Sequence, residues 1–198
     1  MIDNKEKYNA GNVKDDAEIA RPAEEKAIRI LELAFPNAEI ENLHDKREFW
    51  HKGDIELAFP SMTIYGDVKD ESVIHRTGNV FCENHKYFYT DKETRSIDVT
   101  QKSDGWMKAS DYDVVIILDD IDKNIYLINF KKLKEFYENW SLKPAWLSDA
   151  KAWGNCVPLH TCQSRGALLW HIRYEEKEDG NINLKGMKHG RLLEPLAK

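Results

Sequence analysis

The sequence predicts an α/β domain in which α-helices flank a central mixed β-sheet. An amphipathic helical pattern begins near Pro22, a residue suited to a first helical turn, and ends before Pro36. Two alternating runs, 53–59 and 62–69, are typical of half-buried strands. The nearly continuous apolar run 113–118 indicates a strand buried on both faces, as in a sheet that is covered on either side.

Length and composition fit one globular domain. The chain has 198 residues, of which 41% are hydrophobic and 32% charged, and it is long enough to bury a core. No apolar run approaches the roughly 18–20 residues that span a membrane. The N-terminal segment also lacks the apolar stretch of a signal peptide. We therefore expect a cytoplasmic protein with no membrane partner.

The formal net charge of −6 argues against a protein that coats DNA nonspecifically through charge. It does not exclude an enzyme that contacts nucleic acid, because carboxylates gathered around a cation are themselves acidic. The three cysteines, Cys82, Cys156 and Cys162, are expected to be reduced, since their number is odd and no secretion signal precedes them. Cys156, His160 and Cys162 lack the paired spacing of a zinc site, and no fourth ligand is evident.

Three segments divide the chain. Residues 1–20 are polar and charged without a periodic apolar pattern, and are predicted to form a mobile tail. Residues 21–140 hold the periodic elements of the core. Residues 141–198 contain Trp, Pro and Gly with few long periodic stretches, and are predicted to form an extension packed on that core.

The helix is predicted to bury Ile28, Leu31 and Phe35. Glu24 shares this face, at spacings of four, seven and eleven residues from these side chains, whereas Glu25 lies on the solvated face. An acid on the buried face of a helix destabilises the fold unless it has a partner. Glu24 is therefore the acid of this helix that is expected to have a specific role.

The two alternating runs are expected to pair as a hairpin around Pro60-Ser61. In 53–59, the apolar side chains point one way and Asp54 the other. In 62–69, Asp67 and Lys69 share the polar face. Weaker or shorter patterns predict strands at 79–83 and 125–130 and a helix at 131–140, and the alternation at 39–41 is ambiguous.

Asp54, Asp67 and Lys69 form the constellation that points to chemistry. The hairpin brings the two carboxylates side by side, where they repel each other unless a cation is present. Carboxylates, a backbone carbonyl such as that of Val68, and water are the ligands that Mg²⁺ prefers. Lys69 would lie beside the metal-bound water, where it could orient or deprotonate that water and stabilise charge on a phosphate. Taken singly, these residues are more typical of a turn at Asp54 and of an exposed ion pair between Asp67 and Lys69 than of a site.

These residues resemble the PD-(D/E)XK nuclease superfamily. Gly53-Asp54 stands where the family usually has Pro-Asp, and Asp67-Val68-Lys69 matches the (D/E)-x-K element. Many members supply a further acid from the preceding helix, and Glu24 is the best match. The segments RTGNVFCE and GWMKASDYDVVIIL are similar to those of phage and bacterial proteins of this superfamily, so that the resemblance covers roughly 22–130.

The resemblance implies a restriction-endonuclease-like core that hydrolyses DNA with Mg²⁺, or with Mn²⁺ as a substitute. It further implies DNA as the partner and a homodimer. Endonuclease rather than exonuclease action is expected, because the sequence has no recognisable feature for threading a DNA end. The implied metal ligands are Asp54, Asp67, Val68 and Glu24, and the implied catalytic residues are Asp54, Asp67, Lys69, Glu24 and Glu83. The alternative is a catalytically inactive nuclease-like fold that serves as a DNA- or protein-binding phage accessory factor.

Several further residues have two interpretations each. Glu83 is either a second acid near the metal or a surface acid at a strand end. Thr77 and Asn79 either contact a phosphate or form a plain turn, since Gly and Asn favour turns in any case. Trp106 and Lys108 either contact DNA by stacking and charge, or are partial core and a solvated cation.

Overall fold

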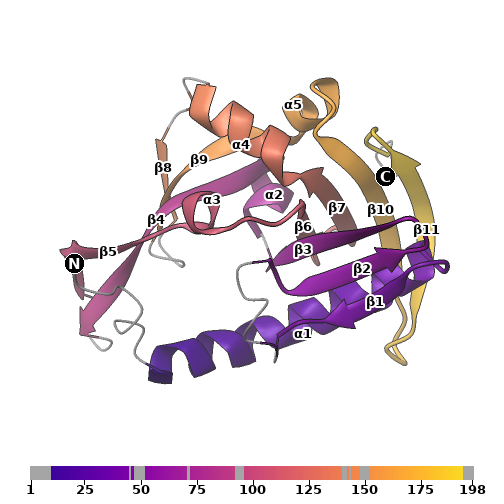
Figure 1. Cartoon of the computed structure of the whole chain (residues 1–198), viewed down its shortest axis with the longest axis horizontal. Helices are drawn as coiled ribbons and strands as arrows, with labels where there is room; N and C mark the ends of the chain where they lie inside the picture. The colour runs from indigo at the N-terminus through magenta and orange to yellow at the C-terminus, as the bar shows by residue number, and fades with distance from the viewer. Residues whose placement is uncertain are drawn as a thin grey trace.

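The computed structural model describes residues 10–44, 46, 52–70, 72–91, 96–139, 142, 144–147 and 152–193. Two β-sheets and several helices make up this part of the chain (Figure 1). The helices are α1 (Ala10–Ala34), α2 (Ser72–Thr77), α3 (Trp106–Ala109), α4 (Phe130–Asn139) and α5 (Leu159–Ser164). The large sheet has the order β1 (Glu39–Asn42), β2 (Ile55–Phe59), β3 (Met62–Asp70), β6 (Val114–Asp119), β7 (Asn124–Asn129), β10 (Leu168–Glu176) and β11 (Ile182–His189). The small sheet has the order β5 (Ser96–Asp104), β4 (Asn79–Asp91), β9 (Ala152–Pro158) and β8 (Pro144–Leu147).

The large sheet is mixed, which confirms the predicted α/β class. Strands β3 and β6 pair in parallel, whereas the other described pairs of this sheet are antiparallel. All six residues of β6 are buried. The continuous apolar run therefore indicates a central strand, as expected, because both of its faces pack against other layers.

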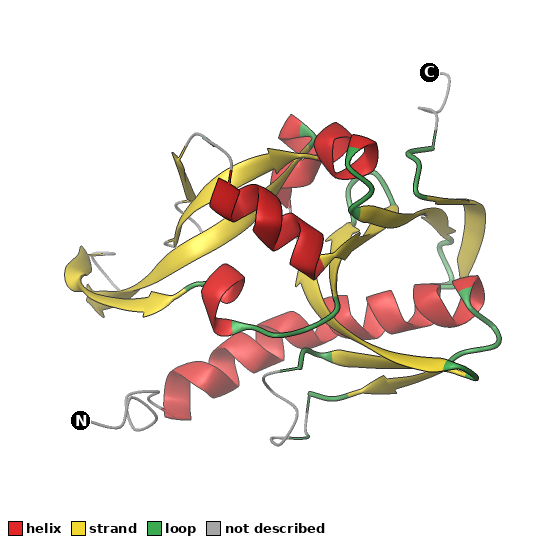
Figure 2. Cartoon of the chain, turned by 45° about the horizontal axis from the view of Figure 1, so that its top comes forward, coloured by secondary structure: helices red, strands yellow, loops and turns green. Residues whose placement is uncertain are grey.

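Each face of the large sheet has its own core. On one face, Ala27, Ile30 and Leu31 of α1 pack in a cluster with Ile116 and other residues of the sheet. The opposite face packs in a second cluster with side chains from α2, α4, α5 and the small sheet, for example Leu133. Figure 2 shows this arrangement, with α1 on one side and the shorter helices and the small sheet on the other.

Helix α1 begins at Ala10, so the prediction of a helix start near Pro22 and a tail over residues 1–20 is wrong for residues 10–20. Pro22 lies inside the helix, where it removes one backbone N–H but leaves the turns on either side intact. Alanine and glutamate in 10–20 favour a helix even without an apolar face, which is why no periodic signal indicates it. Residues 1–9 lie outside the described residues.

The C-terminal segment is part of both sheets rather than an extension packed on a finished core. Strand β10 lies between β7 and β11 in the large sheet, and β9 lies between β4 and β8 in the small sheet. The predicted division at residue 140 therefore cuts through two sheets. Pairing between strands that are far apart along the chain leaves no local pattern, which is why the sequence did not indicate it.

Two further predictions concern cysteines and membranes. Cys82, Cys156 and Cys162 are all free, and the first and last are buried, as expected for reduced residues. No helix in the described part of the chain is both long enough and apolar enough to cross a membrane.

Candidate metal centre at the β2–β3 hairpin

The hairpin places Asp54 beside Asp67. The register pairs Ile55 with Gly66, and the Asp54 amide donates a hydrogen bond of 2.9 Å to the Gly66 carbonyl. One step further along this register, Asp54 faces Asp67. The predicted hairpin and its pair of carboxylates are therefore present, and both side chains leave the polar face of the strands.

The close contact between the backbones at positions 53 and 66 requires glycine at position 53. Its φ is +118°, and a Cβ added there would lie 2.4 Å from the Gly66 carbonyl oxygen. Proline, whose φ is held near −65°, cannot adopt this conformation. Glycine at position 53, where the sequence comparison above noted a proline in similar motifs, thus has a local cause, which is the close contact of Gly53 with Gly66.

Asp54 is mostly withdrawn from water. Its Oδ2 accepts a hydrogen bond of 2.8 Å from the Val68 amide. Burial, together with the charge of Asp67, raises the pKa of Asp54 to about 7, and the charge of Glu24 adds to this effect. We expect a nearby cation to stabilise the ionised form of Asp54, because a cation offsets the repulsion that raises the pKa of this carboxyl group.

Lys69 supplies positive charge to the same place. Its Nζ lies 2.5 Å from Oδ2 of Asp67, a buried oxygen that no donor approaches in regular hydrogen-bond geometry. Burial tends to lower the pKa of Lys69, but the charges of Asp67, Asp54 and Glu83 outweigh it and raise the pKa above its ordinary value. Lys69 is therefore an ammonium ion at neutral pH, which favours charge stabilisation over proton abstraction.

Glu24 reaches the site from α1. It is only 3% exposed, whereas Glu25 is exposed, as the helical pattern predicts. Its Oε2 lies 2.9 Å from Nδ1 of His44, which follows β1. Burial raises the pKa of Glu24, the contact with His44 opposes this, and the charge of Asp67 adds to it.

Two residues that the sequence analysis did not single out belong to this site, His44 and Tyr112. His44 is the partner that a buried acid requires, but nothing in its non-periodic surroundings indicates that it meets Glu24. Tyr112 is 5% exposed, and burial and the charge of Asp67 raise its pKa well above its ordinary value. A tyrosine just before an apolar strand gives no sequence signal that separates it from core.

Glu83 of β4 also lies within reach of the site. Burial raises its pKa, whereas the charges of Lys86 and Lys69 and a hydrogen bond from the Trp106 amide lower it. The charge of Asp67 acts on it as well. Of the two interpretations of Glu83, the structure favours an acid near the centre over an isolated surface acid.

The donor set fits a hard divalent cation. In a strand, the N–H and C=O of one residue point to the same side. Because the Val68 amide points at Asp54, the Val68 carbonyl faces the same side, beyond the end of β2. Asp54, Asp67 and this carbonyl are all oxygen donors, the type that Mg²⁺ prefers. Among the described residues, Glu24, Asp54 and Asp67 do not all bring carboxylate oxygens within 4.8 Å of one another.

The remaining predicted residues divide into two pairs. Thr77 donates its hydroxyl to the Val73 carbonyl at 2.7 Å and accepts a bond from the Asn79 amide at 3.2 Å, which is the plain-turn interpretation. Trp106 and Lys108 lie on α3 beside the site. The Trp106 ring is 6.0 Å from Nζ of Lys69, and Lys108 Nζ is 3.4 Å from Nε2 of His85.

A second group with the composition of a metal site lies at the other end of β6. His75, Asp119 and Asp122 each place one ligand atom within 4.8 Å of the others. Among the described residues, no other three His, Cys, Asp or Glu side chains meet this criterion. His75 pairs with Asp122 at 2.9 Å, and Asp119 accepts a bond from the Asp122 amide at 3.1 Å. These contacts satisfy the group internally, and Cys156, His160 and Cys162 form no such group.

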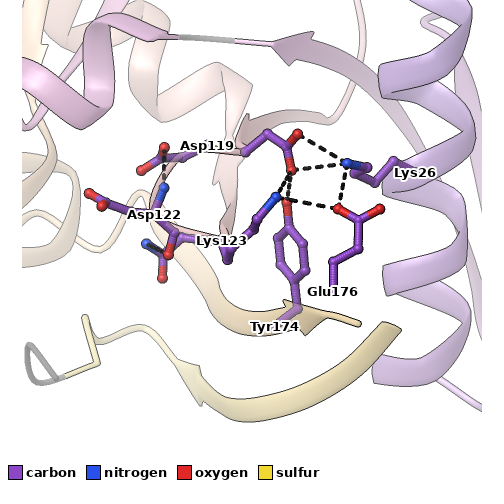
Figure 3. Close-up of polar contacts among 8 residues, drawn as sticks. Lys26, Asp119, Asp122, Lys123, Tyr174 and Glu176 are labelled. Carbon is purple, nitrogen blue, oxygen red and sulfur yellow. Dashed lines mark hydrogen bonds and ion pairs between the residues drawn. The ribbon is translucent and has the colours of Figure 1, made fainter. Parts of the chain in front are cut away.

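A polar network fixes α1 against the sheet (Figure 3). Lys26 donates to Asp120 and to Glu176, at 3.0 and 2.9 Å, and Lys123 contacts the same two carboxylates. The Tyr174 hydroxyl donates to Asp120 at 2.7 Å. Because Lys26 follows Glu24 by two residues, the network also holds the part of α1 that carries Glu24.

No protein-family model matches the sequence, and comparisons with curated proteins and with solved structures found no match either. The function must therefore be argued from the residues and their geometry.

Proposed function

We propose that the protein is a metal-dependent nuclease that hydrolyses phosphodiester bonds in DNA. One observation carries the proposal: Asp54, Asp67 and Lys69 lie together in a half-buried polar site, where their charges act on one another. Two further carboxylates, from α1 and β4, face the same place. The charge of Asp67 raises the pKa of the other three acids, and a cluster of acids of this kind destabilises a fold unless it serves binding or catalysis.

In this proposal, Asp54, Asp67 and the Val68 carbonyl hold Mg²⁺, for which Mn²⁺ can substitute. Glu24 acts through a water molecule and is itself positioned by His44. Bound Mg²⁺ supplies a coordinated water of lowered pKa and polarises the phosphate. The Lys69 ammonium group stabilises the negative charge that develops on the scissile phosphate, and Glu83 orients the Lys69 side chain through its charge.

The choice of DNA and of a homodimer rests on the resemblance to the PD-(D/E)XK superfamily, and the choice of endonuclease action on the lack of a recognisable sequence feature for threading a DNA end. The proposal of a restriction-endonuclease-like core also rests on this resemblance. The order of elements supports it: a helix with a buried acid, a strand that follows Gly53-Asp54, and a strand that carries Asp67-Val68-Lys69 occur in succession in α1, β2 and β3.

Purified protein incubated with supercoiled, linear and branched DNA tests the proposal. We expect cutting with Mg²⁺ or Mn²⁺, no cutting with EDTA, and a loss of at least roughly a hundredfold in Asp67→Asn and Lys69→Met. Glu25→Gln, a change of an exposed acid on the same helix, is the matched control and should cut normally.

Cutting that persists in EDTA, or that survives in both site variants, would contradict this mechanism. If no substrate is cut and the protein instead binds DNA or a protein tightly, the catalytically inactive binding factor becomes the better interpretation. Titration of Mn²⁺ separates these cases further, because an inactive site that has lost its metal should show no binding that depends on Asp54.

A further inference from the structure

The small sheet leaves two tryptophans exposed on one face. Trp146 of β8 is 39% exposed and Trp153 of β9 is 42% exposed. They are direct cross-strand partners, and their ring centroids lie 5.5 Å apart. Tyr87 of β4 joins them, with its ring centroid 5.9 Å from that of Trp146. Burying large aromatic side chains stabilises a fold, so three adjacent rings at a surface require an explanation.

The ladder places charged residues on the same face. His85 pairs with Trp153 on one side and with Asp104 on the other, and Tyr87 pairs with Lys102. Directly opposed residues share a face of the sheet. Lys102 and Lys108 are exposed, and the charges of both act on His85. The described surroundings of the rings are thus polar and contain two lysines and one aspartate, unlike the apolar surroundings of a core cut open for a protein partner.

This face continues into the proposed metal centre. Lys108 contacts His85 at 3.4 Å, and Trp106, two residues before it on α3, contacts Lys69 at 6.0 Å from Nζ to ring. Helix α3 therefore connects the face that carries Tyr87, Trp146 and Trp153 with the lysine of the site. In Figure 1, β4 and β5 extend outward from α3, so the face lies along a path that leads away from the hairpin.

We propose that Tyr87, Trp146 and Trp153 form a stacking platform for unpaired nucleobases, which makes single-stranded DNA, or DNA with a single-stranded segment, the preferred substrate. The inference rests on the proposed nuclease function for its choice of ligand. Bases of any sequence stack on aromatic rings, and lysines beside the rings pair with the phosphates. A strand held in this way would pass along α3, with Lys108 and Trp106 at its side, toward Lys69.

Binding in EDTA tests the platform without cleavage. A fluorescein-labelled oligothymidine of roughly 20 nucleotides and a blunt duplex of equal length are titrated with protein, and anisotropy is measured. We expect tighter binding of the oligothymidine, and roughly tenfold or greater weakening when Trp146→Ala and Trp153→Ala are combined. Trp146→Phe with Trp153→Phe should retain most of the affinity, because the rings remain. Ile121→Ala, which removes an exposed apolar side chain elsewhere, is the control.

Two outcomes would overturn the platform. The first is equal affinity of the wild type for both DNAs, and the second is unchanged oligothymidine binding in the double alanine variant. If that variant also changes its oligomeric state, measured by sedimentation velocity, the rings are assigned to contacts between copies. Mg²⁺-dependent cutting that persists in any of these cases leaves the nuclease proposal standing. Conversely, tryptophan-dependent binding in a protein that never cuts supports the platform alone.

Discussion

At the scale of single residues, the candidate centre is a place where the fold accepts an energetic cost. Asp54 is half-buried next to Asp67, and Glu24 is buried on a helix face that otherwise packs apolar side chains. Asp54 accepts a hydrogen bond from the Val68 amide and Glu24 pairs with His44, but the pKa of both acids remains raised. Such a cost is typical of binding and catalytic sites and is removable by mutation.

Asp54→Asn should therefore stabilise the metal-free protein at alkaline pH. Because the folded pKa is about 7 and the ordinary value 3.8, the protonated form stabilises the fold, and this contribution is lost as the pH rises through 7. The loss is at most about 4 kcal/mol. In EDTA, thermal unfolding at about pH 8 should show a higher midpoint for the variant, with the difference much reduced at about pH 5. Asparagine can still accept the Val68 hydrogen bond.

The same experiment with Mg²⁺ should reverse the order. Added Mg²⁺ is expected to raise the unfolding midpoint of the wild type and to leave that of Asp54→Asn almost unchanged. Glu25→Gln, on the exposed face of α1, should behave as the wild type at both pH values. If the unfolding midpoint of the wild type changes with pH in the same way as that of the variant, Asp54 is not the group that titrates.

At the scale of elements, two kinds of contact hold α1 against the large sheet. Its apolar face packs on the large sheet, and Lys26 reaches Asp120 and Glu176. Burial raises the pKa of Asp120, but hydrogen bonds from Lys123, Tyr174 and Lys26 outweigh it and lower the pKa to about 2. The network thus joins the helix, the β6–β7 turn and β10 at one point.

Lys26→Met should lower the free energy of unfolding at neutral pH by about 1–3 kcal/mol, since two carboxylates lose a part-buried partner. A depressed folded pKa contributes stability above the ordinary value near 3.8 that is lost as the pH falls toward 2, so the variant should differ less from the wild type in acid. Urea unfolding at both pH values measures this. Lys185→Met, which breaks an exposed pair with Glu175, should destabilise the protein clearly less, because water screens exposed ion pairs.

An equal loss in both lysine variants would mean that the network is no more than a surface ion pair. The candidate centre provides a second test of the network, because Lys26 lies within one helical turn of Glu24. If the network positions α1, Lys26→Met should also weaken Mg²⁺-induced stabilisation, whereas Lys185→Met should not.

Local sequence patterns were sufficient to predict the hairpin and β6, because alternating and continuous apolar residues follow directly from how the two faces of a strand are buried. They were also sufficient to choose Glu24 over Glu25, since helical periodicity separates the two faces of α1. They failed for His44 and Tyr112, which reach the site from segments without a period. Their proximity to Glu24 and Asp67 depends on how α1, β1 and β6 pack, which no local pattern contains.

At the scale of the whole molecule, strands from the last third of the sequence complete both sheets. The large sheet has β1, β2 and β3 at one side, but β10 and β11, from the last third of the sequence, complete the other side. Strand β9 does the same for the small sheet, between β4 and β8. Such non-local pairings add loop-closure entropy before any contact is gained. Because such pairings leave no local pattern in the sequence, the boundary predicted at 140 falls where the structure has two continuous sheets.

A fragment of residues 1–140 should therefore not fold cooperatively. It would leave Ile125 and Ile128 of β7 and Val80 of β4 without the strands and helix that bury them. By contrast, a fragment of residues 1–181 loses β11, a strand at the edge of the large sheet, and should retain a cooperative but weaker transition. Circular dichroism with thermal melting distinguishes the two fragments, and added 141–198 peptide should restore a transition to the shorter one. A cooperative transition in 1–140 alone, with an unfolding midpoint near that of the full chain, would mean that the C-terminal segment is dispensable for the core and that the predicted boundary is physically meaningful.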